Sequence, residues 1–419
     1  MGLISNRIRL IQNAGAQICV LPWEVESVVT VKGSFRSFPD FSSGEGIEQD
    51  LAVGLLDKGT TAKSKLEIAE YLESAGASIV FSSDGIRVRF NVKCLKKDLR
   101  GVIQLLVEQL TQPRFNAPEL ELLKQRALAG IERQKQNTSN VARSALSRHL
   151  YSAAHPGHQP PYAELEKAVR DTSIDEISDY YAKSCRFKDL MISLVGDLDN
   201  LHPEKWFDNL SAPSSEANRS DSGYDLKIAE RAREHLEIAD RNNLDVVFAH
   251  PLDVLTTDPD YLSLWTAVFI LGGNFSSRLM STIRDRDGLT YGIRSSLSGM
   301  NSLHGGSWTT SVTLSQENLE RGIKAIREEI STFVESGVSA AELEERKQTL
   351  KGSYQVQLAT TGGLASRVLT NLERCHAKEM IDEHPQRIAE LTLSDVNRVI
   401  ENYLAPENLM IVSAGSSGI

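Results

Sequence analysis

The chain has 419 residues, of which 41% are hydrophobic and 24% are charged, a composition typical of a globular protein and unlike that of a disordered chain. The length predicts two or three domains. The net charge of −10 and the sequence pI near 5.5 disfavour nucleic acid and anionic membranes as partners.

The first half of the chain mixes strand-like and helical patterns. β-branched residues predict strands within Arg7–Leu21 and Val25–Gly33, with a turn between them. Helices are predicted at Gly46–Leu56 and Lys63–Ala75, and Gly76 fits the residue that commonly follows a helix C-terminus. The later patterns predict a strand pair with an Asp84-Gly85 turn, three helices and a closing strand (Ile79–Val92, Lys97–Gln112, Pro118–Lys135, Asp175–Ala182 and Leu190–Val195).

These elements favour an α+β fold with a largely antiparallel sheet, because the strands are joined by hairpins and the helices follow in separate runs. A doubly wound nucleotide-binding fold needs strict alternation of strands and helices, together with a glycine-rich first turn. The sequence has neither feature.

The chain also repeats itself at a spacing of about half its length. Three pairs of segments match in the same order (Asp98–Ile103 with Asn318–Ile323, Ala117–Gln125 with Ala340–Gln348, and Asp189–Gly196 with Asn408–Gly415). We therefore predict two homologous domains, at residues 1–210 and 225–419. The serine-rich segment 211–224 lacks an apolar period and is predicted to be the linker.

The cysteines and the N-terminus give expectations about the compartment. The four cysteines lie far apart without a ligand-like spacing, which indicates buried or incidental thiols (Cys19, Cys94, Cys185 and Cys375). No apolar run reaches the ~18 residues of a membrane span. The N-terminal residues lack the charged and apolar regions of a secretory signal, so we expect a cytoplasmic protein. A periplasmic location is the alternative if a leader has been removed.

Two regions carry a resemblance to a known family. In the first half, Asp50-Leu51-Ala52-Val53-Gly54 precedes Leu55–Thr60. In the second half, Leu271–Leu279 and Ile283–Tyr291 together fill every fixed position of the pattern LGGxxxSRLxxxxRxxxGLxY. Over essentially its whole length the chain resembles the pitrilysin/insulinase family of inverted-motif zinc peptidases. Membership would imply two related α+β domains.

The resemblance also implies that this chain has lost the family's metal site. In the family, a helical His-x-x-Glu-His supplies two zinc ligands and a general base. Asp50, Val53 and Gly54 occupy those three positions here. The family's distal glutamate ligand falls near Glu132, but a single carboxylate does not hold Zn²⁺, so we expect Glu132 to be a solvated helix residue. We predict no metal or other cofactor in this chain.

In contrast, the resemblance places Arg284 and Tyr291 on the arginine–tyrosine pair that the family supplies from its second domain. It implies that these side chains reach a bound peptide near a zinc ion held elsewhere. A guanidinium and a phenol are suited to donate to a carbonyl that becomes an alkoxide, and preorganised donors contribute ~10²–10³ in rate. The alternative is structural: Arg284 would pair with Asp285 or Asp287 on the surface, and Tyr291 would simply pack.

Other chemical motifs in the sequence are weak. His376-Ala377-Lys378-Glu379 lacks a second histidine, and His155-Pro156-Gly157-His158 contains Pro and Gly and is predicted to be a loop, so neither is expected to bind zinc. Gly272-Gly273 is not followed by the lysine of a phosphate loop. The sequence also lacks the G-x-S-x-G elbow of serine hydrolases.

The leading functional hypothesis is a zinc-free subunit of a heterodimeric metallopeptidase, inactive alone. A homologous zinc-bearing subunit would be its partner, and together the two would enclose a chamber for short or unfolded peptides. A homodimer is the alternative assembly in the absence of that partner, and the sequence does not decide between the two. The alternative is a non-catalytic scaffold or peptide-binding protein, resembling the core subunits of respiratory complexes. A third hypothesis is an enzyme with an unrecognised site.

Overall fold

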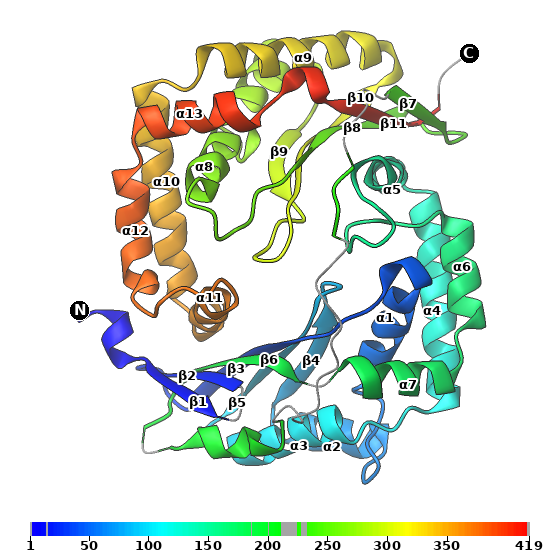
Figure 1. Ribbon diagram of the computed structural model, residues 1–419, viewed down its shortest axis with the longest axis vertical. Helices are drawn as coiled ribbons and strands as arrows, with labels where there is room; N and C mark the ends of the chain where they lie inside the picture. Colours follow the sequence, from blue (N-terminus) through cyan, green and yellow to red (C-terminus); the bar gives the residue numbers. More distant parts are fainter. Residues whose placement is uncertain are drawn as a thin grey trace. The chain divides into compact units, whose positions relative to one another are not determined.

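The computed structural model describes residues 2–13, 16–185, 187–199, 201–210, 224–227 and 233–416 (Figure 1). The chain forms two compact units, and each takes a segment from the opposite half of the sequence. Unit 1 and unit 2 are composed as follows: Met1–Ala129, Leu165–Ser220 and Ser353–His384 in the first, and Gly130–Glu164, Asp221–Gly352 and Pro385–Ile419 in the second.

These units differ from the two contiguous ranges 1–210 and 225–419, because 130–164 belongs to unit 2 and 353–384 belongs to unit 1. Of the predicted linker 211–224, only Tyr224 is described. The boundary between homologous halves therefore stays a prediction. In the described part of the chain, no helix is long and apolar enough to cross a membrane.

Unit 1 is built on a six-stranded sheet with the order β1-β2-β6-β3-β5-β4. Its strands have these bounds: β1 Arg9–Asn13, β2 Ala16–Pro22, β3 Val28–Arg36, β4 Ser78–Ser83, β5 Arg87–Leu95 and β6 Lys188–Gly196. All neighbouring pairs are antiparallel except β2 and β6, which are parallel. The sheet confirms the predicted α+β class with largely antiparallel strands.

Helices of the first half and one of the second half belong to this unit. Their bounds are α1 Glu45–Leu55, α2 Lys65–Ser74, α3 Leu99–Thr111, α4 Ala117–Lys135, α6 Tyr162–Asp171, α7 Ile174–Ser184 and α11 Thr361–Glu373, and α4 continues into unit 2. Short 3-10 turns lie at η1 Ile4–Arg7, η2 Phe41–Ser43 and η3 Pro203–Leu210.

Local sequence signals set the ends of α2. The Glu67 backbone N–H donates to the Ser64 hydroxyl, and the Ser64 N–H donates to the Glu67 carboxylate at 2.7 Å. This reciprocal capping box satisfies two backbone donors that the helix itself leaves free. At the other end Gly76 has a φ of 58°, a left-handed conformation that glycine adopts at low cost.

Both faces of the unit 1 sheet are buried, as the alternation along β2 shows. Ile18 and Val20 join the large core, whereas Cys19 and Leu21 pack on the other face against α11. Figure 1 shows α11 on one face of this sheet and α3 on the other. A helix that comes late in the sequence therefore completes the core of the first unit.

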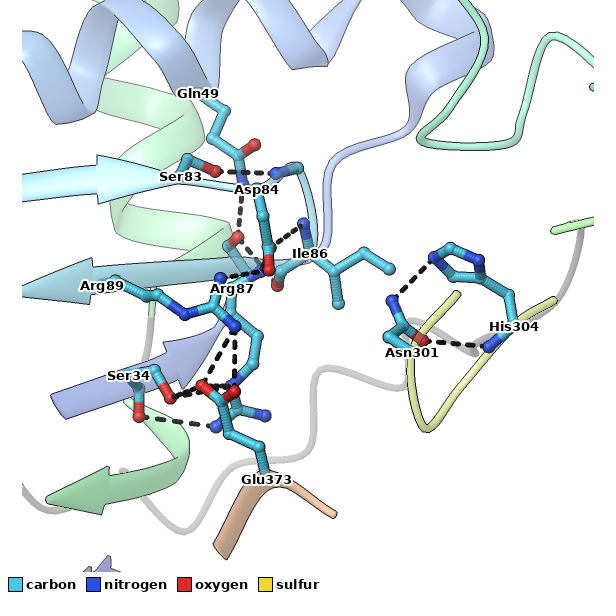
Figure 2. Close-up of polar contacts among 12 residues, drawn as sticks. Ser34, Gln49, Ser83, Asp84, Ile86, Arg87, Arg89, Asn301, His304 and Glu373 are labelled. Carbon is cyan, nitrogen blue, oxygen red and sulfur yellow. Dashed lines mark hydrogen bonds and ion pairs between the residues drawn. The ribbon is translucent and has the colours of Figure 1, made fainter. Parts of the chain in front are cut away.

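Polar contacts attach α11 to β3 and β5. At its start, the hydroxyls of Thr30 and Thr361 lie 2.9 Å apart. At its end, Glu373 accepts from the Ser34 hydroxyl at 2.7 Å and from the Arg89 guanidinium at 3.0 and 3.1 Å (Figure 2). These bonds fix the helix at both ends.

Unit 2 repeats the plan with a five-stranded sheet in the order β7-β11-β8-β10-β9. Its strands are β7 Arg233–Glu237, β8 Asn243–Leu252, β9 Ile293–Ser298, β10 Gly306–Ser315 and β11 Met410–Gly415. The parallel pair β11–β7 occupies the place of β6–β2, and the order then matches strand for strand. The same topology therefore occurs twice, in line with the sequence repeats.

The helices of unit 2 include one from the first half of the sequence. The helical bounds are α5 Thr138–Leu150, α8 Tyr261–Gly272, η4 Met280–Arg286, η5 Gln316–Asn318, α9 Leu319–Ser336, α10 Ala340–Leu358, α12 Met380–Glu390, α13 Leu393–Tyr403 and η6 Pro406–Asn408, and α10 and α12 extend into unit 1. On β8, Val246 and Phe248 face the large core, whereas Val247 and Ala249 pack against α5. Helix α5 thus covers its sheet as α11 covers the other.

Candidate functional site

The degenerate metal-motif positions lie on α1 in unit 1. The Asp50 side chain is exposed and makes no hydrogen bond or ion pair with any described residue. Partial desolvation by the surrounding protein raises the pKa of the Asp50 carboxyl to about 6, yet solvent still reaches the side chain. The carboxylate is therefore ionised at neutral pH.

Val53 and Gly54 make α1 a packed helix at the other two positions. Val53 is only 6% exposed and belongs to the unit 1 core. A Cβ added at Gly54 would lie 2.8 Å from the Leu123 side chain of α4. A glutamate at 53 would bury a carboxylate among apolar groups, and a histidine at 54 would displace Leu123. The residues present do not fit a zinc ion.

Glu132 is a surface residue of α4, as predicted. Its carboxylate is exposed and lies 2.9 Å from the Lys135 ammonium, an i,i+3 pair. Across the described ranges, no group of three His, Cys, Asp or Glu side chains is arranged to hold a metal ion.

The His155–His158 segment is a loop, as its Pro and Gly predict. The His155 ring is fully buried, stacks on Tyr151 with ring centroids 4.3 Å apart and meets the His304 ring edge-on at 4.5 Å. Burial, with a smaller contribution from His304, lowers the pKa of His155 to about 3. Asn301 holds His304 through a 2.8 Å contact with its Nε2 (Figure 2). The loop therefore packs with the His155 imidazole neutral at neutral pH.

Arg284 lies on η4, a helical segment with the wide turn of a π-helix. The Asp287 N–H donates to the Thr282 carbonyl at 3.0 Å, which is an i→i−5 bond. Such bonds are rare in proteins, and where they occur they often lie at functional sites. The Arg284 guanidinium lies 3.6 Å from the Asp285 carboxylate and 5.8 Å from the centre of the Phe275 ring. The ion pair of the structural alternative therefore forms, but it is long and partly exposed.

Tyr291 does not pack, in contrast to the structural alternative. The residue is 98% exposed, and its hydroxyl contacts no described residue. The turn beneath it is held by Thr290, whose hydroxyl donates to the Thr313 carbonyl at 2.7 Å and accepts from the Gly292 N–H at 3.1 Å. The sequence pattern did not reveal this supporting role of Thr290.

A cavity of about 390 Å³ lies beside these residues in unit 2. Strands β9 and β10, the end of α8 and the start of α5 line it (Ser139, Arg143, Asp245, Gly272, Gly273, Asn274, Phe275, Met280, Gly292, Ile293, Arg294, Ser311, Val312 and Thr313). Glycine allows the close approach, because a Cβ at Gly272 would lie 2.5 Å from Ser295 and one at Gly273 would lie 2.8 Å from the Phe269 Cα. Gly272 and Gly273 therefore allow close packing at this position.

Two arginines belong to the lining of this cavity. Arg143 and Arg294 are exposed, and neither forms an ion pair with a described residue. The one carboxylate of the lining, Asp245, accepts hydrogen bonds from the Thr138 and Thr313 hydroxyls. Strand β9 is an edge strand, so its outer backbone groups are open to pairing with an extended peptide. The lining therefore favours a bound ligand that presents carbonyl or carboxylate groups.

Comparison with known families decides the classification. Residues 54–159 match the family model described as "Insulinase (Peptidase family M16)", and residues 171–350 match "Peptidase M16 inactive domain". The chain belongs to the M16 peptidase family. This finding confirms the predicted pitrilysin/insulinase relationship, since the two matches together span about two thirds of the chain.

Curated M16 relatives include inactive and uncharacterised proteins. The chain is 24% identical over 322 residues to "Non-peptidase homolog YmxG" of Helicobacter pylori, covering 75% of this chain and 71% of the relative. It is 23% identical over 352 residues to "Uncharacterized zinc protease YmxG" of Bacillus subtilis, covering 81% of both chains.

Solved M16 structures share the fold. A Pseudomonas fluorescens structure described as a peptidase M16 inactive domain matches with a TM-score of 0.87 and 23% identity, over 98% of both chains. The periplasmic protease PqqL of Escherichia coli matches with a TM-score of 0.80 and 15% identity, over 98% of this chain and 45% of that chain.

Proposed function

We propose that this M16 chain is the zinc-free subunit of a heterodimeric metallopeptidase. A homologous zinc-bearing subunit would cleave the peptide, and this chain would help enclose the substrate and supply Arg284 and Tyr291. The chain alone is then inactive and carries no cofactor. The observation that carries the proposal is the 98% exposure of Tyr291, whose hydroxyl is free to donate to another molecule.

The chemistry of the pair supports this role. An arginine guanidinium presents several fixed donors, and the 3.6 Å contact of Arg284 with Asp285 leaves other donors of this group available. An exposed ion pair of this kind contributes at most ~1 kcal/mol, so a peptide carbonyl can compete for the guanidinium. Tyr291 would add a second donor to the same peptide. Neither group needs a metal in its own chain.

The packing of α1 supports the assignment of zinc to a partner. Val53 lies in the apolar core and Gly54 lies against Leu123, so the helix has neither ligands nor space for them. The unit 2 cavity supports peptide binding, because an extended segment paired with edge strand β9 would place its side chains next to the cavity.

The test uses the purified chain, a zinc-bearing M16 homologue and a flexible fluorogenic peptide. We expect cleavage in the mixture, none by this chain alone, and a decrease of kcat by about 10²-fold for Arg284→Ala and for Tyr291→Phe. Arg286→Ala and Tyr71→Phe are matched controls, because Arg286 pairs with Asp287 and Tyr71 lies in unit 1. Size-exclusion chromatography checks that each complex still forms. Full activity of both test variants in an intact complex would contradict the proposed role.

A second candidate is a peptide-binding scaffold without a role in catalysis. The basic cavity beside β9 fits this candidate equally well, because peptide binding there needs neither Arg284 nor Tyr291. It predicts peptide binding by the chain alone and no gain of activity in any mixture. We retain the cytoplasm as the proposed compartment, with the periplasm as the alternative.

A further inference from the structure

A second cavity, of about 200 Å³, lies within unit 1 on the α11 face of the sheet. Helix α11 lies mainly over β6 and β3, so the edge strand β1 and part of its neighbour β2 extend beyond it. Residues 375–378, which follow the helix, cover this extension only in part and leave the cavity between them and the sheet. Its origin is therefore the width of the sheet relative to one covering helix.

The walls of this cavity are mainly apolar. Alternation along the strands places Leu10 of β1 and Cys19 of β2 on this face, and Val368 and Leu372 of α11 lie opposite. Leu10 is half exposed, so part of its apolar surface is accessible to a molecule in the cavity. A ligand with an apolar chain of a few carbon atoms would bury this surface of Leu10 and gain the free energy of that burial.

Three polar side chains in the same lining have unused hydrogen-bonding groups. Asn371 is only 6% exposed, and its side-chain amide bonds to no described residue. The amide of Gln17 is likewise unpaired, and the half-buried ammonium of Lys378 has no ion-pair partner within the described ranges. The Asn371 amide keeps some accessible surface although the residue is largely buried, so it can hydrogen-bond a molecule in the cavity.

The charges of the lining select the kind of ligand. The lining contains Lys378 and no Asp or Glu. Two acidic groups of this unit are engaged elsewhere: Glu373 binds Arg89, and Asp382 accepts from the Ile4 and Ser5 backbone N–H groups. Glu379, which follows Lys378 in the sequence, is exposed and lies outside the lining. Within the lining, an anion would therefore meet an ammonium and two amides and no carboxylate.

We propose that this cavity binds a small organic carboxylate with a short apolar chain. The carboxylate would pair with the Lys378 ammonium and accept from the Asn371 and Gln17 amides, and the chain would lie between Leu10 and Val368. The volume is below the range of about 300–1,000 Å³ typical of drug-sized ligands, which restricts the ligand to a small molecule. This inference does not depend on the proposed peptidase role, since it concerns another unit and another surface.

Cys375 provides a direct readout of this cavity. Its thiol lies in the lining and is exposed, whereas the thiols of Cys19, Cys94 and Cys185 are buried. The probe is sodium hexanoate, and hexanamide is its uncharged control of the same shape. Alkylation of Cys375 by iodoacetamide, followed by mass spectrometry of the full chain, reports how far each compound protects the thiol.

We expect saturable protection by hexanoate and at least tenfold weaker protection by hexanamide, because charge-assisted hydrogen bonds are the stronger ones. Lys378→Met should raise the half-protecting hexanoate concentration about tenfold, and Lys97→Met, an exposed lysine outside the cavity, should leave it unchanged. Calorimetric titration of the wild type with hexanoate gives an independent measure. The proposal is overturned if hexanoate does not bind, or if it protects Cys375 equally in the Lys378→Met variant.

Discussion

The contact of Glu373 with the sheet gives the sharpest prediction for stability. Glu373, at the last residue of α11, accepts from Ser34 at 2.7 Å and binds Arg89 through both carboxylate oxygens (Figure 2). It also lies 3.6 Å from the buried Arg87 Nε. Glu373→Gln keeps the shape of the side chain and removes its charge, which leaves two arginines with less compensation.

The expected loss follows from the partners that remain. Breaking a buried ion pair costs about 3–5 kcal/mol. Arg89 keeps Asp84, and Arg87 keeps the Ser34 hydroxyl and the Asp189 carbonyl, so we expect the lower end, about 3 kcal/mol. Arg89 is about one third exposed, and solvent screening lowers its share further.

Urea unfolding of Glu373→Gln, followed by circular dichroism, measures this loss. Glu70→Gln is the matched control, because Glu70 is an exposed residue of α2 without a described partner. We expect the midpoint of the test variant to fall and that of the control to stay within error. A decrease in the free energy of unfolding below ~0.5 kcal/mol would refute the view that this carboxylate attaches α11.

Three further predictions concern other parts of the fold. His155 binds its proton more weakly in the folded protein, with a pKa of about 3 against about 6.5 when unfolded, so stability falls as pH decreases from 6.5 towards 3. The free energy of unfolding should be about 2 kcal/mol lower at pH 5 than at pH 7 for this reason. His155→Gln should reduce this pH dependence in urea titrations at pH 5 and 7, and an unchanged pH dependence would refute the lowered pKa of His155. Gly272→Ala should lower stability by about 1–3 kcal/mol through overlap with Ser295, whereas Gly352→Ala, where nothing lies within 4 Å, should not, and thermal melts distinguish the two. Restoring the metal motif (Asp50→His, Val53→Glu and Gly54→His together) should lower the melting temperature without conferring tight zinc binding, and one equivalent of zinc by mass spectrometry would contradict our account of α1.

Local signals in the sequence predicted local structure well. The strand pair at Ile79–Val92 forms as β4 and β5, because the Asp84 carboxylate accepts from the Ile86 and Arg87 N–H groups and Gly85 adopts a φ of 90°. The closing strand Leu190–Val195 lies within β6. In these places the sequence neighbours themselves determine the conformation.

The sequence did not predict features that depend on distant partners. Helix α5 was missed, because its buried face relies on small residues such as Ala142 and Ala145, which give a weak apolar period. The exchange of α5 and α11 between units was equally invisible, since it rests on contacts across the whole chain. The pattern singled out Arg284 and Tyr291 for a role that stays a prediction, but it did not reveal the exposure of Tyr291 or the contact of Arg284 with Phe275.

The position of α11 in the sequence has a consequence for synthesis on the ribosome. The last strand of the first sheet ends at Gly196, but the helix that shields its second face ends only at Glu373, about 180 residues later. At ~5–20 residues per second, the apolar second face of the sheet stays uncovered in the nascent chain for roughly 10 to 35 seconds. Nascent chains are therefore prone to aggregate during this time, and chaperones that bind unfolded chains would act on them then.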